Sequence, residues 1–118
     1  MDSISDKVAK YRAIARNIIT ELGNRKGKRK YFDIEYHTII DDDTGNYILL
    51  RSGWKETSRF YAVLIHIEVK ESGMVWLHED RTDYIIADML LETGISKSEI
   101  VLGFHPPIVR PETGYAVA

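Results

Sequence analysis

Two histidines flank a turn-forming stretch in the middle of the chain. His66 and His78 lie on either side of IEVKESGMVWL, in which Glu71-Ser72-Gly73 can form a three-residue hairpin loop with the glycine in the left-handed position. Such a loop pairs His66 directly with His78 across two strands, with their Cβ atoms about 5 Å apart. Two neighbouring imidazoles can bind a metal ion, transfer protons or respond to pH. A loop of two or four residues would instead place them on opposite faces of the sheet.

A metal site at these histidines needs further ligands. Zinc sites use three or four protein ligands, and the nearest acids expected on the same face are Glu68 and Asp80. The sequence has no cysteine and no HExxH motif. We therefore interpret His66 and His78 as a packed or interfacial pair and rank a metal-dependent enzyme third among three hypotheses. We predict no metal and no cofactor.

A second distinctive stretch is strongly basic. It consists of Arg25, Lys26, Lys28, Arg29 and Lys30, five cations within six residues. Such a cluster can contact DNA phosphates. The formal net charge of -2 and the lack of interleaved aromatic residues favour a solvated loop. Direct DNA binding through this stretch is therefore our alternative function.

Two further motifs are better explained by structure than by catalysis. The acidic stretch 41–45 is typical of a hairpin turn, because a calcium loop would place a glutamate where Ser52 stands. The segment GFHPP (103–107) is rigid, with His105 as a candidate contact. The sequence lacks a phosphate-binding glycine loop, a nucleophile elbow and a dinucleotide fingerprint. We therefore predict no catalytic residues and no enzymatic activity.

The hydrophobic pattern predicts elements of an α+β fold. Apolar residues recur at helical spacing over 4–22, where Gly23 suits the helix end, and again over 82–94, where Thr82 or Asp83 could cap the start. Between them, strand-like segments cover 31–40, 47–54, 59–70 and 74–80. Short links predict a four-stranded antiparallel meander. We expect a short turn at 96–99, after which the tail docks on the domain.

Strand alternation sorts the expected faces of the sheet. The predicted core face contains Ile48, Leu50, Tyr61, Val63, Ile65, Ile67, Val69, Val75 and Leu77. The other face is mixed and contains Phe60, Ala62, Leu64, His66, Glu68, Met74, Trp76 and His78. Two helices are too few to cover both faces, so the mixed face is a candidate oligomer surface. Its predicted interface residues are Phe60, Leu64, His66, Trp76 and His78, with His105 beside them.

Length and composition set the broad class. With 118 residues, 44% of them hydrophobic, the chain suits one domain spanning 1–118. No apolar run approaches the roughly 20 residues that span a bilayer, and the start of the sequence lacks a signal-peptide pattern. We expect a cytoplasmic protein that does not contact a membrane.

Several of these segments together resemble one family. They are Gly53-Trp54, Tyr61, VLIHIEVK (63–70), MVWLHED (74–80), LLETGI (90–95), SEIVLGFHPP (98–107) and YAVA (115–118). Together they resemble the XisI family, small and mostly cyanobacterial proteins named as excision-controlling factors for a DNA element removed during heterocyst differentiation.

The resemblance implies a role in DNA rearrangement. It implies an accessory factor rather than the recombinase, with an XisH-like nuclease-type protein as partner. The family has no established catalytic residues to carry over. We therefore expect protein–protein interaction, with a homo-oligomer (a dimer or higher) and with the XisH-like partner, and DNA contacted either directly or through that partner.

Overall fold

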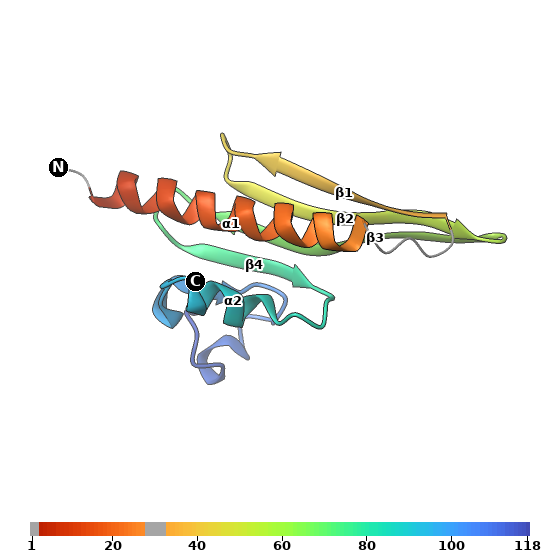
Figure 1. The fold of residues 1–118 in the computed structure, drawn as a ribbon. Coiled ribbons are helices and arrows are strands. Elements are labelled where there is room, and N and C mark those ends of the chain that lie inside the picture. Colours follow the sequence, from red (N-terminus) through yellow and green to blue (C-terminus); the bar gives the residue numbers. More distant parts are fainter. Residues whose placement is uncertain (1–2, 28–32) are drawn as a thin grey trace.

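A five-stranded mixed sheet forms the centre of the computed structural model, which describes residues 3–27 and 33–118 (Figure 1). The strands lie in the order β1-β2-β3-β4-β5; β1 to β4 are antiparallel and β5 runs parallel to β4. In chain order the elements are α1 (Ser3–Gly27), β1 (Asp33–Asp41), β2 (Asn46–Lys55), β3 (Ser58–Val69), β4 (Val75–Asp80), α2 (Ile86–Glu92), η1 (Lys97–Glu99), β5 (Ile100–Leu102) and η2 (Arg110–Glu112).

The fold is α+β as predicted, but the sheet has one more strand than the predicted meander. The chain leaves β4, passes through α2 and returns alongside β4, and such a crossover makes the returning strand β5 parallel. All three residues of β5 are buried. Val101 also forms a bridge with Ala116, where the backbone N–H of Ala116 donates to the Ile100 carbonyl over 2.9 Å.

Helix α1 crosses one face of the sheet (Figure 1). It is longer than the predicted 4–22, because Gly23 keeps a helical conformation and packs against Thr38 and Leu49. Its apolar stripe and the buried side of α2 join the sheet in one hydrophobic core. None of the helices in the described part of the chain has both the length and the apolar character that crossing a bilayer requires.

A β-bulge in β3 changes which side chains face α1. Leu49 pairs with Ile65 and Leu50 pairs with Val63, so Leu64 is an extra residue without an opposite partner on β2. Leu64 and Ile65 are both buried. The predicted core face is correct from Ile65 onward but wrong before it.

The one-residue shift explains each exchange between the faces. Tyr47 and Leu49 occupy the core, in place of the predicted Ile48 and Leu50. On β3 the shift turns Tyr61 and Val63 away from α1 and brings Phe60 and Ala62 to its side.

Asp80 at the end of β4 fixes the start of α2. Its carboxylate accepts hydrogen bonds from the backbone N–H of Thr82 (3.0 Å), the Thr82 hydroxyl (2.7 Å) and the backbone N–H of Ile86 (2.9 Å). The helix begins at Ile86, after Ile85 in a left-handed conformation with φ 54°. Neither predicted cap, Thr82 nor Asp83, holds the first turn, because Asp80 takes that role.

We expect Asp80→Ala to lower the free energy of unfolding by about 1–2 kcal/mol, since backbone N–H groups at the helix start lose their acceptor. Asp83→Ala, at an exposed position three residues on, is the matched control and should change it by less than about 0.5 kcal/mol. Urea unfolding followed by circular dichroism measures both variants. If both variants lost the same free energy of unfolding, Asp80 would not be the residue that caps α2.

Candidate functional site

The hairpin between β3 and β4 brings the two histidines together. The loop is the predicted Glu71-Ser72-Gly73, with Gly73 at φ 91° and the backbone N–H of Lys70 donating to the Met74 carbonyl over 2.9 Å. The expected pair Glu68–Trp76 is present. Farther from the loop, however, a bulge in β4 makes Glu79 the partner of His66, so that His78 has no partner opposite it on β3. Direct pairing of the histidines is therefore wrong, although their ring centroids are still only 4.7 Å apart.

Each imidazole has its own hydrogen-bond partner. His66 Nε2 donates to Asn46 Oδ1 over 2.8 Å, and His78 Nε2 donates to Glu68 Oε1 over 2.9 Å. Because both acceptor oxygens lack a proton, these contacts place the N–H on Nε2 of each ring. Burial and the neighbouring His78 lower the pKa of His66, against the opposing effect of Glu68.

The bulge in β4 also moves Asp80, one of the two acids expected as a further metal ligand. Glu79 takes the position opposite His66, while Asp80 pairs with Ile65 and so turns toward the helices. There its carboxylate caps α2. Within residues 3–27 and 33–118, no group of three histidine, aspartate or glutamate side chains could hold a metal ion.

Trp76 links the histidines to the C-terminal segment. Its ring stacks on His78 with centroids 5.6 Å apart, and Arg110 Cζ and Lys70 Nζ lie 5.1 and 5.3 Å from its centroid. Arg110 Nε also donates to the carbonyl oxygen of His105 over 3.0 Å. The histidine cluster is thus a junction that attaches the segment after β5 to the sheet, and His105 belongs to that segment.

The remaining predicted interface residues are not on the mixed face. Leu64 is only 5% exposed because the bulge turns it into the core. The register places Phe60 on the side of α1, where Arg51 Cζ lies 5.8 Å from its ring centroid. The exposed aromatic residues of the outward face are instead Trp54 and Tyr61.

The basic stretch lies mostly outside the described residues. Arg25, at the end of α1, forms an ion pair with Glu21. Lys28, Arg29 and Lys30 fall outside the described residues, as does the side chain of Lys26. Phosphate contact by this stretch therefore stays a prediction.

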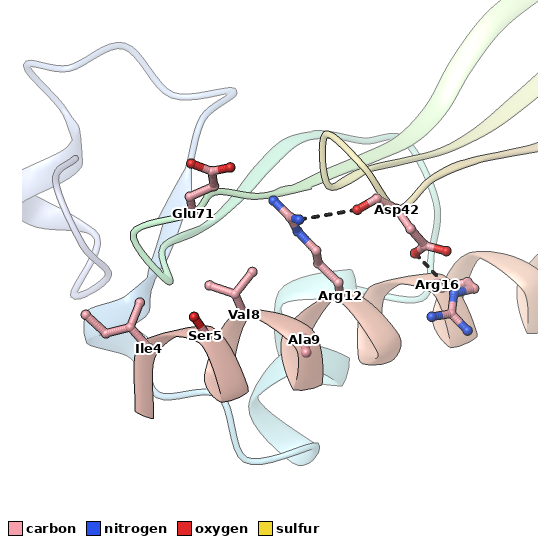
Figure 2. A pocket seen from close by; sticks show the side chains of 8 residues that line it. All are labelled: Ile4, Ser5, Val8, Ala9, Arg12, Arg16, Asp42 and Glu71. Carbon is pink, nitrogen blue, oxygen red and sulfur yellow. Dashed lines mark hydrogen bonds and ion pairs between the residues drawn. The ribbon is translucent and has the colours of Figure 1, made fainter. Parts of the chain in front are cut away.

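A groove of about 730 Å³ lies between the first half of α1 and two loops at one end of the sheet (Figure 2). It is lined by Ile4, Ser5, Val8, Ala9, Arg12, Arg16, Asp42 and Glu71. Arg12 donates to the carbonyl oxygens of Val69 (3.0 Å from Nη2) and Asp42 (3.2 Å from Nη1), and Arg16 Nε lies 3.3 Å from Asp42 Oδ1. The two arginines therefore fasten α1 to the loops that form the opposite wall.

Sequence reasoning missed this groove. Its only signal was the pair Arg12 and Arg16, one helical turn apart beside the apolar stripe of α1. The acids that line the same groove are Asp42 in the 41–45 turn and Glu71 in the loop between β3 and β4, which are distant in sequence. The groove can hold a partner that offers apolar groups together with groups of both charges.

Across the described residues, fold and groove define a small α+β protein with α1 over a mixed sheet and a polar-rimmed groove at one end. The XisI protein family matches residues 5–117. The chain therefore belongs to the XisI family.

Two solved structures from Anabaena variabilis are similar to this chain. A XisI-like protein has a TM-score of 0.85 at 30% identity, over 94% of this chain and 99% of that one. The fdxN element excision controlling factor XisI has a TM-score of 0.80 at 30% identity, over 95% and 99%. No curated protein matches the chain.

The histidine cluster predicts how stability depends on pH. Because the pKa of His66 is lowered in the folded state, the unfolded chain binds more protons as pH falls below about 6.5. The free energy of unfolding should be highest above pH 6.5. As the pH falls, it should decrease until the pH lies below the lowered pKa of His66 in the folded state. Chemical unfolding at a series of pH values from 7.5 to 5 measures this.

His66→Gln should show a smaller decrease over the same range, since the variant has no titrating imidazole at this position. His105→Gln, which replaces a histidine of the C-terminal segment outside this pair, is the matched control, and the change in His66→Gln should exceed the change in this control. Parallel curves for wild type and His66→Gln would contradict the role given to His66.

Proposed function

We propose that this chain is a non-catalytic accessory factor that controls excision of a DNA element by binding an XisH-like nuclease-type protein. The observation that carries the proposal is the near full-length match to the fdxN element excision controlling factor XisI. Membership of the XisI family supports the same role.

The side-chain chemistry supports a binding role over catalysis. The histidines are committed to Asn46 and Glu68, and Asp80, the other acid expected at the site, caps α2. These contacts hold the sheet and α2 together. A binding protein needs such contacts to present a fixed surface.

The groove beside α1 is the proposed contact for the partner. It is lined by the apolar residues Val8 and Ala9 and by the cations Arg12 and Arg16 beside the acids Asp42 and Glu71. An apolar centre with a charged rim is the ordinary composition of a protein interface. Both arginines are already held by backbone or carboxylate oxygens, so the rim keeps its shape before a partner arrives.

Co-expression with an XisH-like protein tests the proposal. We expect a complex that survives purification at micromolar concentration. Ala9→Arg should weaken it at least about tenfold, because a large cation fills the groove. Thr20→Arg, on an exposed part of the same helix, is the matched control and should bind normally. Absence of any complex would contradict the proposed partner.

Direct DNA binding is the second candidate, favoured by the five cations between Arg25 and Lys30. If they contact phosphates, log K should fall with log salt concentration, and each lost contact should reduce the slope by about one. Changing all five to glutamine should therefore flatten the salt dependence measured by gel shift. If the chain did not bind DNA at low salt, or if the five-residue variant kept the slope of log K against log salt concentration, direct DNA binding by this stretch would be contradicted.

A further inference from the structure

In the described part of the chain, the outward face of β1, β2 and β3 has an apolar centre between charged ends. Of the described helices, only α1 makes substantial contact with these strands, and it lies on the opposite face. Along the middle of the outward face lie Ile48, Leu50 and Val63, all half-buried. Around them, Tyr61 is 64% exposed, Trp54 47% and Ile39 43%. Exposed apolar side chains gathered in this way are typical of a binding surface.

The charges on this face are arranged on the two sides of β2. Asp33 on β1, Trp54 on β2 and Arg59 on β3 form one row across the sheet. The guanidinium of Arg59 lies 5.3 Å from the Trp54 ring and 5.4 Å from the Tyr61 ring. Within this row, the acid on β1 and the cation on β3 make the face complementary to its own copy.

We infer that this face binds a second copy of the chain, sheet on sheet, about a two-fold axis that runs along β2. Such an axis places β1 of one copy over β3 of the other. Residues in the same row across the sheet then lie opposite the same row of the second copy. Asp33 then faces Arg59 of the second copy, and the reverse contact forms as well. Leu50 meets Leu50 of the second copy at the centre, within the roughly 10 Å that separates packed sheets.

Other occupants and arrangements fit the charges less well. A two-fold axis across the strands would stack β1 on β1 and β3 on β3, so that Asp33 meets Asp41 and Arg59 meets Glu68 of the second copy. The first pair is repulsive, and the second gains little because Glu68 is already paired with Lys70 and His78. Nucleic acid would meet Asp33, Glu35 and Asp41 along β1, which repel phosphate.

The proposed axis does bring Asp41 over Glu68 of the second copy, at the far end of the face. Packed sheets cross at about 30°, so rows at one end can separate while those at the other touch. The contact is therefore centred between Leu50 and the row containing Trp54. This dimer does not depend on the proposed role in excision, and partner binding can be measured separately in every variant below.

A charge-reversal cycle tests the axis. Sedimentation equilibrium of the wild-type chain should show a dimer. Asp33→Arg and Arg59→Glu should each raise the dimer dissociation constant at least about tenfold, because like charges meet twice. The double variant restores both pairs with opposite sign and should recover wild-type affinity within about threefold. Lys10→Glu, exposed on α1, is the control and should leave the dimer unchanged.

Circular dichroism of each variant establishes that the fold is kept, since both positions are exposed. A monomeric wild-type chain at millimolar concentration would overturn the inference. So would single variants that dimerise normally, or a double variant no better than either single one. Recovery in the double variant supports this axis specifically, because only this arrangement places Asp33 opposite Arg59.

Discussion

The bulge at Leu64 determines the two faces of the sheet. Without it, strand alternation would continue unbroken along β3 and Tyr61 would lie on the same side as Ile65. With it, Leu64 and Ile65 both enter the core, and Tyr61 turns outward. Burying a side chain of this size contributes about 1.5–3 kcal/mol, enough to offset one disrupted ladder position. The core beneath α1 and the apolar outward face are two results of the same extra residue.

The position of α1 depends on polar contacts at one end of this sheet. Arg12 binds the carbonyl oxygen of Val69 at the end of β3, and both Arg12 and Arg16 bind Asp42. The buried Tyr47 donates from its hydroxyl to Asp42 over 2.8 Å. On the other side of the helix, Tyr11 donates to Glu99 over 2.7 Å, and burial together with Glu99 raises the pKa of Tyr11 to about 12. Because these groups satisfy one another, the end of the sheet keeps a fixed shape, and the groove is part of that shape.

Most elements could be predicted from hydrophobic periodicity, because both helices and the four antiparallel strands are long enough to show a repeat. The strand β5 could not, since three consecutive buried residues, Ile100–Leu102, carry no alternation. Neither bulge has a sequence signal here, and each shifts a whole register by one residue. This is why Leu64 and Phe60 were assigned to the wrong face, and why Asp80 was expected beside His78. The groove was missed for a different reason: its walls meet only after the hairpins have formed.

The two proposed binding surfaces lie on opposite sides of the sheet. The groove lies beside α1, at the end of the sheet near Asp42, whereas the outward face has its contact centre near Trp54. A two-fold axis along β2 keeps strand direction, so both grooves of a dimer would open at the same end of the assembly. Dimerisation would therefore leave partner binding unobstructed and would hold two partner molecules in a fixed relation. Excision of a DNA element requires cutting at two ends, and a symmetric pair of grooves would suit a factor that positions one nuclease-type partner at each.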